Sequence, residues 1–261
     1  MKRVDLNMVE HCRKLRTSCP PTQPNVTEDC VFYSDGEPIG FYLRQAPSRM
    51  ASLLAIANNE FISSRVPKTK MSRGPQGTNK IRRERKGAGE DIEQLSCILG
   101  SVPKDPIMRR DYPKTSSVHL VSSARVYSKA MLLLAEASAS LIKEILPDQH
   151  KTQKGLIETT PEKYRFGSLF TSSIANHNIS APYHRDTKNI VGCVNMILTK
   201  RLNTKGGNLN IPDYGATVDQ CDGSVLVYPA WKNMHGVTPI VETHDKAYRN
   251  SFVFYPLKGV R

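Results

Sequence analysis

The sequence has no apolar run long enough to cross a membrane and no apolar leader at its N-terminus. Its most apolar stretch, residues 123–146, is interrupted by charges, whereas a spanning helix needs ~20 consecutive apolar residues. The first 17 residues are polar and charged, unlike a secretory signal peptide. We therefore expect an intracellular protein without a membrane partner, in the cytoplasm and nucleoid, or in the nucleus if the source is a eukaryote. The interrupting charges are Arg125, Lys129, Glu136, Lys143 and Glu144.

Paired cysteine motifs are also missing. The six cysteines form no C-x-x-C pair, and the spacing of His11 with Cys12, Cys19 and Cys30 fits no standard zinc site. Without an export signal we expect reduced thiols, which excludes a disulfide-stabilised secreted domain. The fold must then rest on an apolar core, and 261 residues suffice for one large β domain with an N-terminal extension, which we expect to be monomeric.

Acidic residues are scarce relative to basic ones. The chain has 37 Lys and Arg against 24 Asp and Glu, giving a formal net charge of +13 and a pI near 9.5. This balance is typical of proteins that bind nucleic acid, although charge alone does not distinguish DNA from RNA.

The excess of positive charge is concentrated between residues 65 and 86. This segment has nine basic residues and one acid, Glu84, for a net charge of +8. Its prolines and glycines and its lack of apolar periodicity predict a loop. Flexible Lys and Arg side chains suit sequence-tolerant contacts to phosphates, and a solvated loop without a partner is the alternative. The residues that we expect to contact DNA are Arg73, Lys80, Arg82, Arg83, Arg85 and Lys86.

A long amphipathic helix is predicted over residues 123–146, within the apolar stretch. Ser122 or Ser123 can cap its start, and Pro147 ends it. We expect it to pack on the outer face of a sheet and to have no chemistry of its own. Its apolar residues at helical spacing are Val126, Ala130, Leu133, Ala137, Leu141 and Ile145.

The C-terminal part of the chain is rich in short strands and turns. Residues 190–198 predict a buried strand, Leu209 and Ile211 alternate with polar residues, and residues 224–228 and 248–255 predict two further strands. This pattern favours an α+β protein with a double-stranded β-helix core of the jelly-roll or cupin type and flanking helices. We expect residues 123–261 to hold the long helix and this core, and residues 1–122 to form an N-terminal extension with an Asp-Gly hairpin near residues 31–44.

Candidate metal ligands lie within the strand-rich part. His184 and Asp186 form a His-x-Asp motif, and His235 follows Asp186 after 48 residues. Two imidazoles and one carboxylate are the ligands of a mononuclear Fe(II) site that leaves positions open for a co-substrate and O₂. His-x-Asp by itself is common and is often a surface turn, so the prediction rests on the ordered set.

Two histidines follow the motif, and we assign the ligand role to His235. His244 lies in the polar stretch 241–246, which predicts a hairpin tip pointing away from a barrel mouth. His177 is expected to be a core residue or to lie behind the ligands. Arg249 offers a guanidinium fork for a carboxylate, such as the distal carboxylate of 2-oxoglutarate.

These motifs resemble the TET/JBP family of Fe(II)- and 2-oxoglutarate-dependent dioxygenases, which oxidise the 5-methyl group of pyrimidines in DNA. The resemblance covers residues 165–257 well. It rests on residues 184–193, the Gly-Gly-x-Leu-x-Ile-Pro-x-Tyr-Gly segment at 206–215, the His-Gly-Val-Thr-Pro segment at 235–239, and the Arg-x-Ser-x-x-x-Tyr pattern at 249–255. It implies that His184, Asp186 and His235 are the catalytic iron ligands and that Arg249 and Ser251 bind 2-oxoglutarate.

The resemblance also implies two residues that bind the base. Asn189 falls where TET-like enzymes place an asparagine on the flipped base, and Tyr255 falls where they place a stacking aromatic. JBP-like thymine hydroxylases are expected to have an acidic residue at the first position, so Asn189 favours 5-methylcytosine. Leu257 replaces the histidine of the TET pattern. A turn residue at Asn189 and a core aromatic at Tyr255 are the structural alternatives.

The sequence therefore predicts an oxidoreductase that uses Fe(II), 2-oxoglutarate and O₂ to hydroxylate the 5-methyl group of a flipped pyrimidine in double-stranded DNA, preferably 5-methylcytosine. Thymine in DNA is the main alternative substrate, ahead of an N-alkylated base or a protein side chain. A catalytically silent DNA-binding protein is the alternative outside enzymes.

Overall fold

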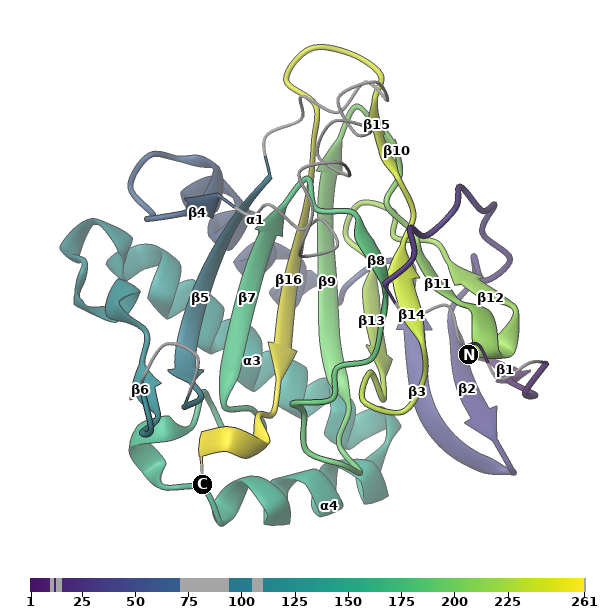
Figure 1. The fold of residues 1–261 in the computed structure, drawn as a ribbon, viewed down its shortest axis with the longest axis horizontal. Helices are drawn as coiled ribbons and strands as arrows, with labels where there is room; N and C mark the ends of the chain where they lie inside the picture. Colours follow the sequence, from purple (N-terminus) through teal and green to yellow (C-terminus); the bar gives the residue numbers. More distant parts are fainter. Residues whose placement is uncertain (10–11, 13–15, 71–93, 105–109, 261) are drawn as a thin grey trace.

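The computed structural model describes residues 1–9, 12, 16–70, 94–104 and 110–260. Its centre is a pair of facing β-sheets, and helices cover the outer side of the larger sheet (Figure 1). Apolar side chains from both sheets, including Leu226 and Val218, pack together between them. This arrangement confirms the predicted α+β fold with a double-stranded β-helix core.

The larger sheet has ten strands among the described residues. These strands come from both the N-terminal and the C-terminal parts of the sequence. Its central strand β16 is antiparallel to β9 on one side and to β7 on the other. In spatial order its strands are β1 (Lys2–Asp5), β2 (Cys30–Ser34), β3 (Glu37–Leu43), β13 (Val225–Tyr228), β9 (Asn195–Leu202), β16 (Tyr248–Tyr255), β7 (Ser172–His177), β5 (Leu95–Val102) and β4 (Thr69–Lys70), and β6 (Lys114–Thr115) pairs with β5.

The smaller sheet has four strands and lies in front of the larger one in Figure 1. Their order is β12 (Ala216–Val218), β11 (Leu209–Ile211), β14 (His235–Val237) and β8 (Ala181–His184). A two-stranded ribbon of β10 (Thr204–Gly206) and β15 (Ile240–Glu242) extends beyond it. The stretch 241–246, predicted as a hairpin tip, overlaps the end of β15 and the loop that follows it, but the hairpin is wrong, because β15 pairs with β10 whereas β16 pairs with β7 and β9.

Three α-helices are described: α1 (Ser48–Ile62), α3 (Arg125–Ile145) and α4 (Pro147–Glu158). The predicted helix at 123–146 is confirmed as α3, preceded by a short 3₁₀ turn. Its buried residues Tyr127, Met131 and Leu134 join the main core under the outer face of the large sheet. Further 3₁₀ turns are Ser117–Leu120, Ser122–Ala124, Glu162–Tyr164, Pro212–Tyr214 and Lys258–Val260. No helix in the described part of the chain is long and apolar enough to span a membrane.

The expected N-terminal extension, residues 1–122, supplies strands to the same sheet as the core. β3 pairs with β13, and β5 pairs with β7. The predicted hairpin is confirmed as β2 and β3, joined by Asp35 and Gly36, which have φ angles of 55° and 83°. Asp-Gly suits this tight turn because both turn residues need positive φ. The boundary at residue 122 stays a prediction about how the chain is organised.

Two local predictions need correction. The strand expected over 190–198 begins only at Asn195, because Gly192 has a φ of 83° and the Ile190 N–H donates to the Pro256 carbonyl at 3.0 Å. The basic segment was expected to be a loop throughout, but its residues Thr69 and Lys70 form β4 against β5. Arg73, Lys80, Arg82, Arg83, Arg85 and Lys86, the expected DNA contacts, lie outside the described residues.

Candidate metal centre and its pocket

The three predicted metal ligands meet at one end of the smaller sheet. His184 ends β8 and His235 begins β14, and the two residues are directly paired between these antiparallel strands. Asp186 follows two residues after His184, with its Oδ1 3.5 Å from His184 Nε2. One ligand atom from each residue lies within 4.8 Å of the others. The β8–β14 pairing therefore aligns two side chains that are 51 positions apart in the sequence.

Both histidines are held in the form that a metal needs. His184 Nδ1 lies 2.7 Å from the Pro182 carbonyl, and His235 Nδ1 lies 3.1 Å from the Asn233 carbonyl. An Nδ1–H that donates to a carbonyl leaves Nε2 as the free lone pair. Burial, helped by the neighbouring His184, lowers the pKa of His235 to about 4, so its ring is neutral at pH 7.

The carboxylate of Asp186 is also held in place by hydrogen bonds. Asn195 Nδ2 donates to Asp186 Oδ2 at 3.0 Å, and Asn189 Nδ2 donates to Asn195 Oδ1 at 2.9 Å and lies 3.4 Å from Asp186 Oδ2. Because these amides occupy Oδ2, Oδ1 is left facing His184. Sequence reasoning missed Asn195, whose only signal was a polar residue in a predicted buried strand.

A buried carboxylate, Asp213, ties the two ligand segments together. Its Oδ2 accepts from the Met234 N–H at 3.0 Å and from Asn233 Nδ2 at 3.3 Å, just before His235. The same oxygen lies 3.6 Å from a guanidinium nitrogen of Arg185, the residue between the other two ligands. Asp213 is 1 % exposed. Nothing in the local sequence pattern marks this role, because its contacts lie on segments far along the chain.

The metal ligands line a cavity of about 560 Å³ between the two sheets. One side comes from the smaller sheet and the other from β7, β9 and β16. Its apolar lining includes Ile174, Ile197 and Val253, which share one row across these three strands. Lining side chains with polar groups include Asn176, Asn189, Asn195, Gln220, Arg249 and Ser251.

Arg249 lies in this cavity as a buried cation. It is 3 % exposed, and its Nε has no hydrogen-bond partner among the described residues. Burial first, and then the charge of Arg201 across the β9–β16 pair, lower its pKa. A buried charge without a counterion is costly. A carboxylate bound beside Arg249 would remove that cost.

The Gly-Gly segment allows the chain to pass close over Arg249. A Cβ at Gly207 would lie 3.1 Å from Arg249 Nε, and one at Gly206 would overlap the Pro239 carbonyl oxygen. Both glycines have a φ of 69°. Side chains are therefore excluded at both positions by space and by backbone conformation.

The other predicted residues are distributed as follows. Asn189, Ser251 and Tyr255 line the cavity together with Arg249. His244 is exposed on the loop between β15 and β16, with its Nδ1 3.4 Å from Thr243 Oγ1. His177 Nδ1 lies 2.8 Å from Asn250 Oδ1. Among the described residues, His177 does not belong to the group of possible metal ligands.

Two imidazoles, one carboxylate and a buried guanidinium that line the same cavity fit Fe(II) and a 2-oxo dicarboxylate. With a double-stranded β-helix fold, this set defines the class of Fe(II)- and 2-oxoglutarate-dependent dioxygenases. The chain belongs to the Tet_JBP family: residues 110–258, more than half of the sequence, match the model of the oxygenase domain of the 2OGFeDO superfamily. It is therefore a dioxygenase that uses Fe(II), 2-oxoglutarate and O₂.

NgTET1 shares this fold, and two further solved structures align at lower TM-scores. NgTET1 in complex with 5mC DNA aligns with a TM-score of 0.59 and 14% identity, covering 99% of this chain and 83% of that one. A 2OG-Fe(II) oxygenase family protein from Burkholderia pseudomallei aligns with a TM-score of 0.48 and 12% identity, covering 83% and 84% of the two chains. OsALKBH1 aligns with a TM-score of 0.44 and 14% identity, covering 84% and 97%. No curated protein matches the sequence.

Proposed function

We propose that this dioxygenase hydroxylates the 5-methyl group of a flipped-out pyrimidine in double-stranded DNA, preferably converting 5-methylcytosine to 5-hydroxymethylcytosine. Membership of the Tet_JBP family and the fold shared with NgTET1, whose structure contains 5mC DNA, support this proposal. In the overall reaction one oxygen atom of O₂ enters succinate, formed with CO₂ from 2-oxoglutarate, and the other enters the methyl group.

Each residue of the pocket has a role in this proposal. His184 and His235 bind iron through Nε2 and Asp186 binds it through Oδ1, and bound Fe(II) supplies the O₂ chemistry. Arg249 and Ser251 bind the distal carboxylate of 2-oxoglutarate, which orients the co-substrate toward the ligands. The apolar row from Ile174 to Ile197 keeps the cavity dry around the reacting methyl group.

The observation that carries the preference for cytosine is the orientation of Asn189. Its Nδ2 donates to Asn195, and no described residue donates to its Oδ1. We propose that the base binds with the C4 substituent, next to the 5-methyl group, against Asn189, which lines the cavity beside Asp186. Cytosine has an amino donor there, whereas thymine has a carbonyl acceptor. A free acceptor at Asn189 therefore favours 5-methylcytosine.

A cavity between two sheets requires that the base leave the DNA helix to reach the metal ligands. The methyl group of a paired pyrimidine lies in the major groove, so an enzyme that acts on it in a pocket must rotate the nucleotide outward. Tyr255, half-buried at the cavity wall, is placed to stack on such a base.

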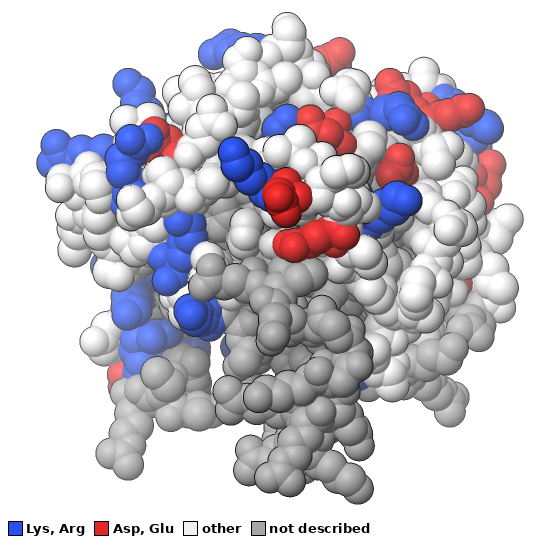
Figure 2. All heavy atoms as spheres, turned by 90° about the horizontal axis from the view of Figure 1, so that it is seen from above, with Lys and Arg blue, Asp and Glu red and all other residues white. Residues whose placement is uncertain are grey.

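Positive charge supports DNA as the polymer partner. On the face seen in Figure 2, Lys and Arg side chains gather in a column on the left, while acidic side chains lie mainly toward the upper right. We propose phosphate contacts by Arg73, Lys80, Arg82, Arg83, Arg85 and Lys86 in addition.

The proposal is tested by product analysis on defined duplexes. Purified protein with Fe(II) and 2-oxoglutarate is incubated with matched duplexes that contain either cytosine or 5-methylcytosine. Succinate is measured, and the digested nucleosides are identified by mass spectrometry. We expect 5-hydroxymethylcytosine and matching succinate from the methylated duplex alone. Formation of 5-hydroxymethyluracil from both duplexes, with methylcytosine untouched, would instead establish a thymine hydroxylase.

A further inference from the structure

The side chain of Gln220 has one hydrogen-bond donor that the protein leaves unused. Gln220 is 1 % exposed and lines the cavity, and its Nε2 has no acceptor among the described residues. A buried amide donor without a partner costs about 1–3 kcal/mol. Such a donor facing a ligand cavity indicates an acceptor on the ligand.

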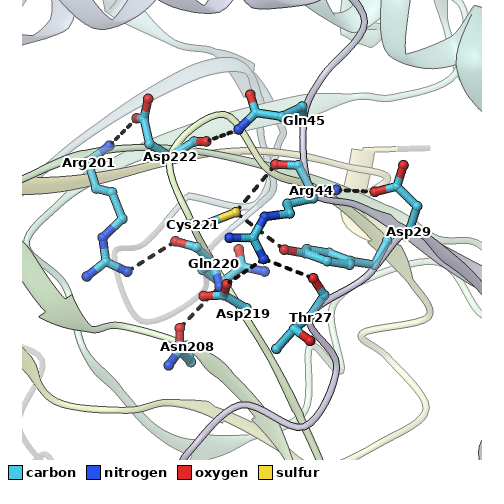
Figure 3. Close-up of polar contacts among 11 residues, drawn as sticks. Thr27, Asp29, Arg44, Gln45, Arg201, Asn208, Asp219, Gln220, Cys221 and Asp222 are labelled. Atoms are coloured by element: carbon cyan, nitrogen blue, oxygen red, sulfur yellow. Dashed lines mark hydrogen bonds and ion pairs between the residues drawn. The ribbon is translucent and has the colours of Figure 1, made fainter.

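The rest of Gln220 is held by hydrogen bonds, and Figure 3 shows those of its backbone to Asn208 and Arg201. Its Oε1 accepts from Thr199 Oγ1 at 2.9 Å. Its backbone N–H donates to Asn208 Oδ1 at 3.1 Å, and its backbone carbonyl accepts from Arg201 Nη1 at 3.2 Å. The backbone and the side-chain oxygen of Gln220 are therefore both held by hydrogen bonds.

Strand register places this donor at the arginine end of the cavity. Thr199, which holds the Gln220 amide, is paired with Ser251 on β16, and Arg201, which holds its carbonyl, is paired with Arg249. Side chains that are directly opposite on neighbouring strands have Cβ atoms ~5 Å apart. Gln220 therefore lies level with the two residues proposed to bind the distal carboxylate.

Two buried N–H donors without an acceptor among the described residues then belong to side chains that line the same cavity. Arg249 Nε is buried and unpartnered in the same way as Gln220 Nε2. Ser251 Oγ lies 3.5 Å from Asn176 Nδ2, which leaves its hydroxyl hydrogen able to turn into the cavity. A carboxylate has lone pairs for all three donors, whereas a neutral or cationic group would satisfy none of the N–H groups as fully.

We propose that Gln220 Nε2 donates a hydrogen bond to the distal carboxylate of 2-oxoglutarate, as a third donor beside Arg249 and Ser251. This inference rests on the proposed co-substrate site at Arg249. Arg249 supplies the positive charge that attracts the carboxylate. Gln220, whose amide oxygen is held by Thr199, sets the orientation of the carboxylate. Gln220 thus helps to select a dicarboxylate of this length. This role can be tested without a DNA substrate.

The test is direct binding of glutarate, which has the distal carboxylate of 2-oxoglutarate but lacks its 2-oxo group. Titration calorimetry compares wild type with Gln220→Leu and Gln220→Glu. We expect Gln220→Leu to weaken glutarate binding about tenfold, as befits the loss of a hydrogen bond to a charged group. Gln220→Glu places like charges together and should weaken it further. Gln45→Leu is the matched control, because Gln45 is exposed in the same network, donating to the Asp222 carbonyl, but does not line the cavity.

Further readouts separate binding from a structural role. Gln220→Leu should raise KM for 2-oxoglutarate while kcat and Co(II) affinity stay near wild type. Thr199→Val, which removes the hydroxyl that fixes the amide, should cause a smaller loss of glutarate affinity and serves if the Gln220 variants do not fold. Unchanged glutarate affinity in the folded variants would overturn the inference. If Arg249→Lys also binds glutarate as wild type does, the co-substrate site itself is misplaced; if only Arg249→Lys is impaired, the role of Gln220 alone is wrong.

Discussion

At the scale of single residues, Arg249 is a buried cation for which we propose a carboxylate ligand as the counterion. We predict that Arg249→Lys raises the apparent KM for 2-oxoglutarate roughly tenfold or more, because lysine keeps the charge but loses the fork worth roughly 1.5–3 kcal/mol. Steady-state kinetics at saturating DNA measures it. An unchanged KM would mean that another residue binds the distal carboxylate.

The metal ligands give a second prediction at this scale. His235→Ala should abolish Fe(II)-dependent succinate formation and weaken Co(II) binding, because it removes one of three protein ligands. His244→Ala should be nearly silent, since His244 is exposed on the loop beyond β15. Circular dichroism checks that both variants are folded. Normal turnover by His235→Ala together with loss in His244→Ala would reverse the assignment.

Asn189 has two possible roles, and its prediction must separate them. Asn189→Ala should lower kcat/KM on methylcytosine DNA, because the amino group of the base loses its hydrogen-bond acceptor. The expected decrease corresponds to roughly 1–3 kcal/mol in activation free energy. Asp213→Asn is the control, because Asp213 supports the segments that carry His235 and Arg185 and has no hydrogen bond to Asn189. It should weaken metal binding without changing the ratio of methylcytosine to thymine oxidation. An equal ratio in both variants would leave Asn189 only its role at Asp186. Asn189→Asp is less informative, since its carboxylate would face that of Asp186.

The residues found from sequence and those missed differ in how their roles are encoded. His184, Asp186, His235 and Arg249 are recognisable because their residue types and order along the chain are distinctive. Gln220 is not, because its role depends on pairing between β9 and β16 and on which donors remain unused after folding. Such information exists only in the three-dimensional structure.

At the scale of elements, Asp213 connects segments that the sequence keeps apart. We predict that Asp213→Asn weakens Co(II) or Fe(II) binding by roughly 10- to 100-fold, the range typical of residues that support metal ligands. The amide keeps the shape but loses the charge opposite Arg185 and one acceptor for the Met234 N–H. Metal titration measures it. Asp222→Asn, which alters an exposed carboxylate bound to Lys200, is the control.

The result for Asp213 also tests how the two ligand segments are coupled. If Asp213→Asn lowers the melting temperature but binds metal like wild type, the carboxylate stabilises the fold only. If metal affinity falls while the melting temperature of the metal-free protein changes little, the carboxylate prearranges His235 relative to the His-x-Asp motif.

Elements were predictable where their signal is local. The helix α3 and the strand β16 were expected from apolar periodicity over their own residues, and both form. The predicted start of β9 was wrong. A positive φ at Gly192 and a hydrogen bond from the Ile190 N–H to the Pro256 carbonyl prevent an extended strand before Asn195. Apart from the Asp-Gly hairpin of β2 and β3, which strands pair, including the parallel β1 and β2, depends on residues far apart along the chain and was not predictable.

At the scale of the whole molecule, the pocket exists because both parts of the chain build one sheet. β3 and β5, from residues 1–122, extend the sheet on either side of the strands that line the cavity. The helices occupy the other face, so the cavity side stays open for a substrate (Figure 1). The net charge of +13 then acts on any polyanion that approaches.

The last prediction concerns DNA binding by the basic segment, residues 65–86. Changing Arg82, Arg83, Arg85 and Lys86 together to Gln should weaken binding to duplexes of any sequence. It should also flatten the salt dependence by about 0.9 in log–log slope for each phosphate that the protein no longer neutralises. Binding isotherms at several salt concentrations measure both effects. Turnover of a free 5-methylated nucleoside, where detectable, should be unaffected, because the metal ligands are unchanged.

A charge-matched control separates local binding to phosphates from the overall field of the protein. Lys129, Lys143, Lys151 and Lys154 are carried by α3 and α4, on the outer side of the large sheet. Their change to Gln lowers the net charge by the same amount but should leave the salt slope close to wild type, because counterion release depends on the phosphates that the protein neutralises and not on its total charge. If both variants lower affinity equally with an unaltered slope, the basic segment makes no phosphate contacts and net charge alone attracts the DNA.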